Sequence, residues 1–283
     1  MNDPHARQLA APRGGAVSGL GRPGAPDVSN DRALFEYVLR LADNGLVLAQ
    51  RLSEWVGKGP VLEEDIALTN VGLDLLGQSR MWFAYAQDVE ARIAGVGRGE
   101  DQLAFLRDAH EFRNLLLVEQ PNGSYADTIA RQFLFDHWHL LLLRELAQSI
   151  DERIAEVAAK AVKEVSYHVE RSSDWMVRLG DGTDESHARM QAALDDLWTY
   201  AGEMFVPDEV ELSLVDTGVA ADVRSLQAPW DGAVNAVLAD ATLARPGETF
   251  VRKGGKQGVH TEHFGRLLAE MQFLQRAYPG ASW

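Results

Sequence analysis

Hydrophobic residues along this chain recur at steps of three and four, the spacing of helices with one buried face. The pattern predicts four long helices, at about residues 32–56, 63–95, 124–147 and 150–180. Shorter helices are expected at about residues 101–118, 187–205, 230–241 and 261–278. The period-two alternation of strands is almost absent. Long helices joined by short breaks indicate an all-α protein, an antiparallel helical bundle with appended helices.

Residues that begin and end helices support these boundaries. Ser124 and Asp127 have the spacing of a capping box, which predicts a helix start. Ser149 and Glu152 repeat that spacing before the fourth long helix. Gly180, followed by Asp and a second Gly, is a typical helix stop.

The second long helix, at about 63–95, is apolar around most of its circumference rather than along one stripe. A helix with water on its outer side should not have this pattern. Either the appended helices cover that side or another protein does, and the pattern leaves both open.

The first 30 residues differ from the rest, with four prolines, five glycines and no run of large apolar residues. We expect residues 1–30 to be a disordered tail and residues 31–283 to form one helical domain. The tail has no apolar core of a secretory signal, although an organelle transit peptide is an alternative. We find no stretch of about 18 apolar residues that would span a membrane.

The composition and net charge of the chain exclude several classes of function. The formal net charge is −15, from 27 basic and 42 acidic residues, which argues against binding nucleic acid or an anionic membrane. The chain has no cysteine, so it has no disulfide framework, no cysteine-ligated zinc or iron–sulfur cluster and no cysteine nucleophile. We expect a cytoplasmic protein of a reducing compartment.

Acidic residues placed among apolar core positions are the main candidates for chemistry. Each long helix carries one, namely Asp43, Asp74, Asp136 and Glu164, and His168 lies one turn after Glu164. Bundles that bind two irons project carboxylates and imidazoles inward from all four helices. Since a buried carboxylate is costly unless paired, we expect these side chains to meet each other or counter-ions.

The ligand set is nevertheless incomplete for two irons. Such sites have Glu-x-x-His on two helices, but the residue three positions after Glu164 is Tyr167 and the second helix has no histidine. Four carboxylates and one imidazole fall short of the roughly six donors required. The residues favour a metal-free polar cluster at a former metal site. A working metal centre and unrelated buried pairs are the alternatives.

Three other candidates are weaker. His137 and His139 are two residues apart and face different sides of a helix, so we expect core or interface histidines. His260 and His263 could share a metal, but Thr261 between them resembles a helix N-cap. The glycine-rich segment 253–258 lacks the spacing of a phosphate-binding loop, so we expect a turn.

Long segments of the chain resemble the structural C subunits of multicomponent ring-1,2-phenylacetyl-CoA epoxidases. The matching segments are residues 39–55, 68–80, 114–131, 163–168, 178–184, 258–276 and 278–280. The resemblance covers about residues 31–283 and implies a ferritin-like fold. It also implies partners: a ferritin-like catalytic subunit that holds a di-iron centre, a small bridging subunit, and a reductase with flavin and an iron–sulfur cluster that uses NADPH.

The leading hypothesis is therefore a non-catalytic subunit that supports the catalytic one, is inactive alone and holds no cofactor. Asp43, Asp74, Asp136, Glu164 and His168 would form its metal-free polar cluster. The alternatives are an active di-metal oxidase that uses these residues and a helical binding protein unrelated to oxygenation.

Overall fold

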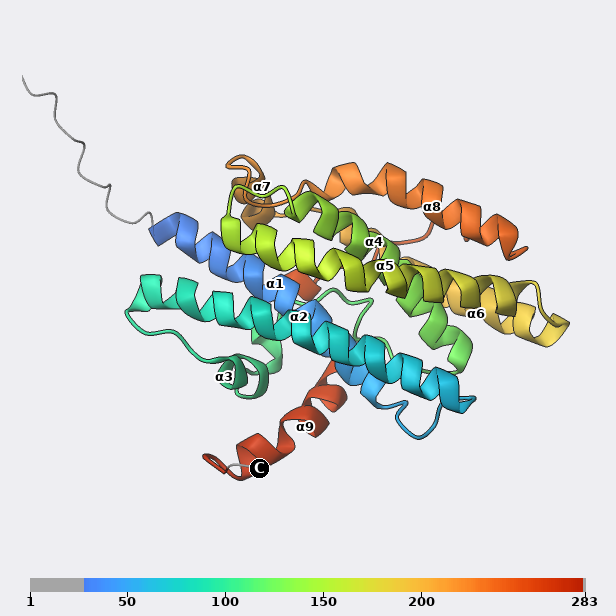
Figure 1. Cartoon of the computed structure of the whole chain (residues 1–283), viewed down its shortest axis with the longest axis horizontal. Coiled ribbons are helices and arrows are strands. Elements are labelled where there is room, and N and C mark those ends of the chain that lie inside the picture. Colours follow the sequence, from blue (N-terminus) through green and yellow to red (C-terminus); the bar gives the residue numbers. More distant parts are fainter. Residues whose placement is uncertain (1–27, 282–283) are drawn as a thin grey trace, which may run out of the picture.

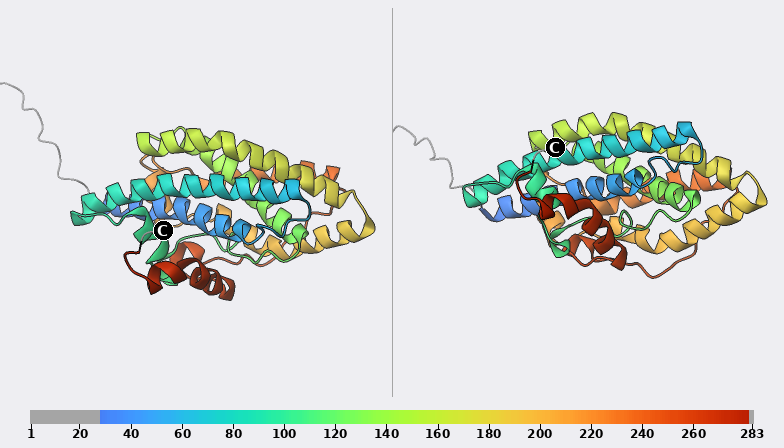
Figure 2. Two further views of the ribbon diagram at one scale, coloured as in Figure 1. Left: turned by 60° about the horizontal axis from the view of Figure 1, so that its bottom comes forward. Right: turned by 90° about the horizontal axis from the view of Figure 1, so that it is seen from below.

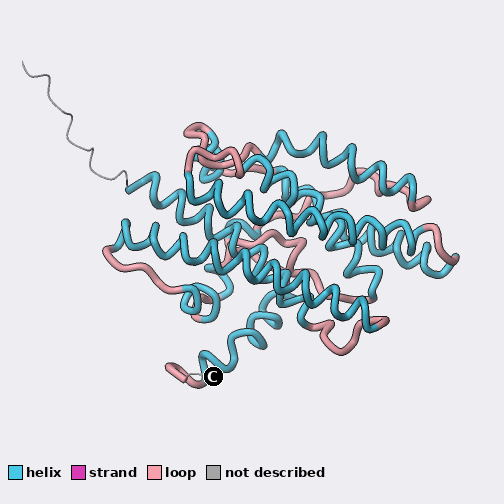
Figure 3. Tube along the Cα trace, in the orientation of Figure 1, coloured by secondary structure: helices cyan, strands magenta, loops and turns pink. Residues whose placement is uncertain are grey.

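Two helical hairpins form the centre of the molecule in the computed structural model, which describes residues 28–281 (Figure 1). Helix α1 (Val28–Ser53) packs along α2 (Leu62–Ala94), and α4 (Tyr125–Leu146) packs along α5 (Glu152–Gly180). In this part of the chain only helices, turns and loops occur (Figure 3). The all-α, ferritin-like bundle expected from the sequence is confirmed. Among the described residues, none of the helices combines the length and the hydrophobicity needed to span a membrane.

The expected N-terminal tail falls almost entirely on residues 1–27, which lie outside the described residues. Helix α1 begins at Val28, so the last three residues that we assigned to the tail form the first turn of that helix.

Helix starts follow the side chains that can accept hydrogen bonds from free backbone N–H groups. The capping box at α4 is confirmed: Ser124 is the N-cap, and its N–H donates to Asp127 Oδ2 at 2.6 Å. At α5 the expected cap was wrong. Asp151 is the N-cap and accepts from the Ile154 N–H at 3.0 Å. The Ser149 hydroxyl instead donates to the Val219 carbonyl at 2.7 Å.

The predicted helix at about 101–118 was also wrong. Helix α3 (Glu100–Phe105) is short, a 3₁₀ turn η1 (Ala109–Glu111) follows, and the chain is then irregular up to α4. Side chains from other elements accept hydrogen bonds from backbone N–H groups that would otherwise donate within a helix. The Leu115 N–H donates to Asn44 Oδ1 and the Leu116 N–H donates to Glu203 Oε2, both at 2.8 Å. These tertiary acceptors replace the helical ladder.

Appended helices cover the α4 side of the bundle, and two of them contact α1, near its middle and at its C-terminal end (Figure 2). They are α6 (Asp184–Ala201), α7 (Glu209–Val215), α8 (Gln227–Asp240) and α9 (Glu262–Ala277). Two 3₁₀ turns, η2 (Gly202–Phe205) and η3 (Val223–Leu226), connect them, and a third, η4 (Gly255–Gln257), precedes α9. We had not predicted α7, although Asp208 and Glu211 form a capping box at its start.

Tryptophan side chains fix the appended region to α4. Trp230 of α8 is buried, and its Nε1–H donates to the Leu134 carbonyl at 3.1 Å. Trp138 of α4 donates in the same way to the Met204 carbonyl at 3.1 Å. Each indole buries a large apolar surface and satisfies its one donor, so these residues belong to the core.

Helix α2 is covered on one side only. It packs against α1 and touches α5 and α3, whereas α6–α9 lie elsewhere (Figures 1 and 2). Its outer side chains Leu62, Ile66 and Leu73 are exposed. Of the two explanations for this apolar helix, coverage by the appended helices is therefore wrong.

Candidate functional site

Asp43 lies on α1 in the centre of the fold, where its carboxylate is completely buried. Arg107 forms an ion pair with it: Nη2 contacts Oδ1, and Nη1 donates to Oδ2 at 3.0 Å. The Arg113 backbone N–H also donates to Oδ2, at 2.8 Å. The Arg107 guanidinium stacks over the Phe112 ring, 4.1 Å from its centroid. Asp43 therefore has a buried cation of the same chain as its counter-ion.

Asp74 and Glu164 form hydrogen bonds across the seam between α2 and α5. Nε2 of the buried His168 lies 3.1 Å from Asp74 Oδ2. About one turn further along α2, Gln78 Nε2 donates to Glu164 Oε2 at 2.9 Å. Asp74 therefore meets another of the five candidate residues, as expected, whereas Glu164 meets the neutral amide of Gln78 rather than another candidate or a counter-ion.

Asp136 lies on α4, buried, and accepts a hydrogen bond from Gln132 Nε2 at 3.3 Å. Burial raises the pKa of Asp136 to about 6, although the nearby His168 and the Ser172 hydroxyl lower it. Asp136 is thus close enough to His168 to interact with it, and its hydrogen-bond partners are neutral side chains.

The two histidines of α4 are also buried. The pKa of His137 is lowered to about 4 by burial, and its Nε2 lies 3.0 Å from the Ser173 hydroxyl. The pKa of His139 is lowered to about 3 by burial and, secondarily, by His168. Both are core histidines, as the sequence indicated.

These side chains do not make a di-iron site. Among residues 28–281, no group of three or more His, Asp and Glu side chains is placed to hold a metal ion. Asp43 in particular lies against a guanidinium, which repels a metal cation at that carboxylate. The donor set therefore does not fit two irons, and the five residues consist of an ion pair and hydrogen-bonded pairs.

The histidines before α9 have different roles. His260 Nδ1 lies 2.8 Å from Glu119 Oε2, and its Nε2 lies 3.2 Å from the Phe112 carbonyl oxygen. Both ring nitrogens are occupied, so His260 is no metal ligand here. Thr261 is the N-cap residue of α9, as expected, and its N–H donates to the same Glu119 carboxylate at 2.6 Å.

The glycine-rich segment is a turn rather than a phosphate-binding loop, as expected. The N–H groups of Gly254 and Gly255, which would have to contact a phosphate, donate to Glu203 Oε1 at 2.8 and 2.9 Å. Lys256 is buried and donates to both carboxylate oxygens of Glu211 at 2.8 Å. The turn is therefore a structural element.

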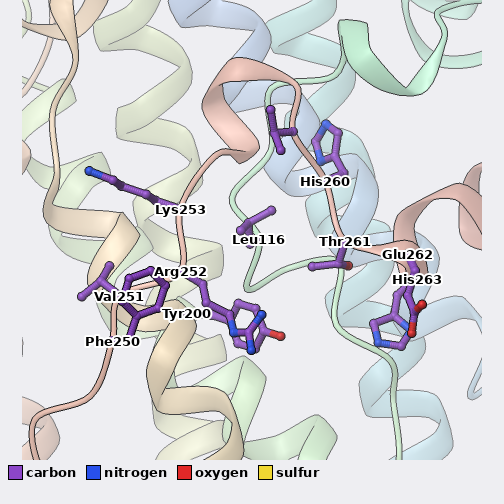
Figure 4. Close-up of a pocket in the computed structure, with 11 residues that line it drawn as sticks. Leu116, Tyr200, Phe250, Val251, Arg252, Lys253, His260, Thr261, Glu262 and His263 are labelled. Carbon is purple, nitrogen blue, oxygen red and sulfur yellow. The ribbon is translucent and has the colours of Figure 1, made fainter.

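An open cavity of about 640 Å³ lies beside this turn (Figure 4). It is lined by Leu116, Tyr200, Phe250, Val251, Arg252, Lys253, Val259, His260, Thr261, Glu262 and His263. Figure 4 shows Lys253 and His263 at opposite ends of the cavity. No group in it pairs a nucleophile with a base, so it provides no catalytic arrangement.

Sequence reasoning missed Arg107, Glu119 and Glu203, which organise the centre of the fold. Glu119 and Glu203 are buried and each accepts at least two hydrogen bonds from other segments. Arg107 is 64 residues from Asp43. Short-range spacing gives no sign of a partner at that distance.

Comparison with known proteins identifies the family of this chain. Residues 24–283 match the family described as phenylacetic acid catabolic protein. A relative from Escherichia coli K12, named as the C subunit of 1,2-phenylacetyl-CoA epoxidase, is 52% identical over 250 residues. That match covers 88% of this chain and 99% of the relative. The chain therefore belongs to the family of phenylacetic acid catabolic proteins.

Proposed function

We propose that this chain is a non-catalytic subunit of a 1,2-phenylacetyl-CoA epoxidase that supports a ferritin-like catalytic sister subunit. A relative that is 52% identical over almost its whole length is named as the C subunit of that enzyme. At this similarity the fold and the core are shared, so a shared role in a multisubunit complex is the natural inference.

The observation that carries the non-catalytic assignment is the ion pair between Arg107 and Asp43. In a di-iron bundle the acid of the first helix binds metal. Here a buried guanidinium neutralises that acid and also donates to the Glu111 carbonyl at 3.0 Å. Metal binding would require Arg107 to leave a site in which it is completely enclosed.

The remaining chemistry belongs to the partners in this proposal. The sister subunit would hold the di-iron centre and bind the acyl-CoA, and a small subunit would bridge the assembly. A reductase with flavin and an iron–sulfur cluster would deliver electrons from NADPH. This chain contributes a rigid helical surface and no cofactor.

Metal analysis tests the assignment. The chain and its sister subunit are each purified, loaded with ferrous iron and desalted, and iron is counted per chain. We expect iron in the sister subunit alone, and epoxidation of phenylacetyl-CoA only when both subunits and the reductase are present. The variant Asp136→Asn, assembled into the complex, should retain the wild-type rate because this acid touches no reacting atom.

Two results would contradict the proposal. About two irons per copy of this chain, with loss of turnover in Asp136→Asn, would identify an active di-metal oxidase. Unchanged growth on phenylacetate after deletion of the protein would indicate a helical protein unrelated to this oxygenation.

A further inference from the structure

We propose that the open cavity beside the glycine-rich turn binds a purine nucleoside diphosphate group, a role beyond the proposed function and independent of it. Such a group occurs as a free nucleotide and as a part of coenzyme A and of nicotinamide dinucleotides. The cavity lies between the end of α6 and the start of α9 (Figure 4). Its volume of about 640 Å³ is typical of sites for small molecules.

Hydrogen bonds hold both walls of the cavity in place. On one wall the Arg252 N–H donates to the Thr199 carbonyl at 2.9 Å, and the Thr199 hydroxyl donates to the Phe250 carbonyl. On the other wall the Thr261 N–H donates to the buried Glu119 carboxylate at 2.6 Å. Because the walls are already fixed, a ligand loses little binding energy in ordering them.

Two cations of the cavity have no counter-ion among the described residues. Arg252 and Lys253 are exposed, and within residues 28–281 neither forms an ion pair, whereas the next basic residue, Lys256, is buried against Glu211. Acidic residues outnumber basic ones by 42 to 27 in this chain, so two adjacent cations without acidic partners favour an anionic ligand. Guanidinium and ammonium groups both bind phosphate oxygens well.

Aromatic rings beside these cations provide a surface for a base. Phe250 is 81% exposed, and the ring centroid of Tyr200 lies 5.7 Å from the Arg252 guanidinium carbon. Figure 4 shows Tyr200 and Arg252 between Lys253 at one end of the cavity and His263 at the other. Any purine base can stack on an aromatic side chain. Rings next to cations therefore match a ligand in which a base is joined to phosphates.

The size of the cavity favours a nucleotide over a smaller aromatic acid. At about 30 Å³ for each water-sized group, 640 Å³ holds roughly 20 non-hydrogen atoms, about twice the number in a one-ring carboxylic acid. A one-ring acid would also carry a single negative charge and would leave one of the two cations unpaired.

Glu262 is the one carboxylate among the residues that line the cavity, and it is exposed in the first turn of α9. Its charge repels an anionic ligand, so its removal should strengthen binding. In an apolar groove the change Glu262→Gln would have little effect. The direction of this change therefore distinguishes an anion site from an apolar groove.

Calorimetric titration of the full chain with ADP tests the site. We expect a dissociation constant below about 100 μM and weaker binding at high salt. Adenosine and inorganic pyrophosphate each lack one half of the ligand and should bind at least about tenfold more weakly. Coenzyme A and NADPH contain the same group, and the tightest binder of the three identifies the source of the group.

Matched variants locate the site. Arg252→Ala and Phe250→Ala should each weaken ADP binding at least about fivefold, whereas Glu262→Gln should strengthen it at least about twofold. Arg266→Ala and Phe273→Ala are the controls, because both residues are exposed on α9 outside the cavity, and each should change binding less than about twofold. Every substituted residue is exposed, so the variants should fold, which thermal unfolding checks.

Several results would overturn this proposal. No binding of ADP, coenzyme A or NADPH at about 1 mM would exclude the ligand class. Equal affinities for adenosine and ADP would contradict the phosphate contacts, and equal losses in Arg252→Ala and Arg266→Ala would place the ligand elsewhere. These titrations use this chain alone, so their failure would leave the metal analysis and the epoxidation assay of the proposed function unaffected.

Discussion

Replacement of Arg107 by methionine should be one of the most destabilising single changes in this protein. The side chain is enclosed between α1 and the segment after α3, and its Nη atoms contact both carboxylate oxygens of Asp43. Methionine fills a similar apolar volume but has no donors. After the change, the buried Asp43 carboxylate keeps only one hydrogen-bond donor, the Arg113 N–H at 2.8 Å.

The magnitude follows from the charge that is left behind. Breaking a buried ion pair by removing one partner costs about 3–5 kcal/mol in free energy of unfolding. Asp43→Leu should cost a similar amount because it leaves the guanidinium unpaired. The double variant Arg107→Met with Asp43→Leu removes both charges, so its loss should be smaller than the sum of the single losses by at least about 2 kcal/mol.

Urea unfolding followed by tryptophan fluorescence measures these free energies. Arg189→Met is the control, since Arg189 pairs with Glu185 on the surface of α6, and its change should stay within about 0.5 kcal/mol. If the losses of the two core variants simply add in the double variant, Arg107 and Asp43 are not coupled, and the reasoning that assigns them as an ion pair fails.

Two further predictions concern burial and close packing. The pKa of Asp136 is raised from 3.8 to about 6, so the stability that its protonated form confers is present below about pH 4 and is lost as pH rises through 6. Asp136→Asn should therefore raise the free energy of unfolding at pH 7 by about 3 kcal/mol and have little effect at pH 4, as urea titrations at both pH values can check. Gly255→Ala would place a Cβ 2.0 Å from the Asn114 carbonyl oxygen and should lower the thermal midpoint by several degrees. Gly265→Ala, in open space on α9, should raise the midpoint slightly; equal effects of the two alanines would contradict the close approach.

The long helices could be predicted because their signals are local. Steps of three and four apolar residues and the Ser124–Asp127 cap depend on neighbours within one or two turns. The capping pair Asp208 and Glu211 was equally local, and reading it would have revealed α7. Most of the helix content was therefore accessible from the sequence.

The irregular segment before α4 could not be predicted because its backbone partners are distant in sequence. Its apolar residues have helical spacing, yet Leu115 and Leu116 donate to side chains 71 and 87 residues away. Local propensity favours a helix in this segment, but hydrogen bonds to buried acceptors of α1 and η2 outweigh that preference.

The candidate site was predictable only in part, because some of its hydrogen-bond and ion-pair partners are also distant in sequence. The sequence indicated correctly that Asp43, Asp136 and His168 face the core, since they lie among apolar positions. The same pattern was misleading for Asp74 and Glu164, which are only partly buried at the seam between α2 and α5. The sequence did not indicate which charge each acid meets: Asp43 pairs with an arginine from another segment, whereas Asp74 meets His168. Partner identity depends on how the helices are arranged, and helix periodicity does not specify that arrangement.

The pairing of Asp43 with Arg107 also affects how the protein folds after synthesis in the cell. A metal that neutralises a buried acid must be captured from a limited supply, whereas Arg107 is synthesised with the chain. The counter-charge is available as soon as residue 107 leaves the ribosome, so packing around Asp43 does not wait for iron. Cells starved of iron should therefore still accumulate this chain in folded form.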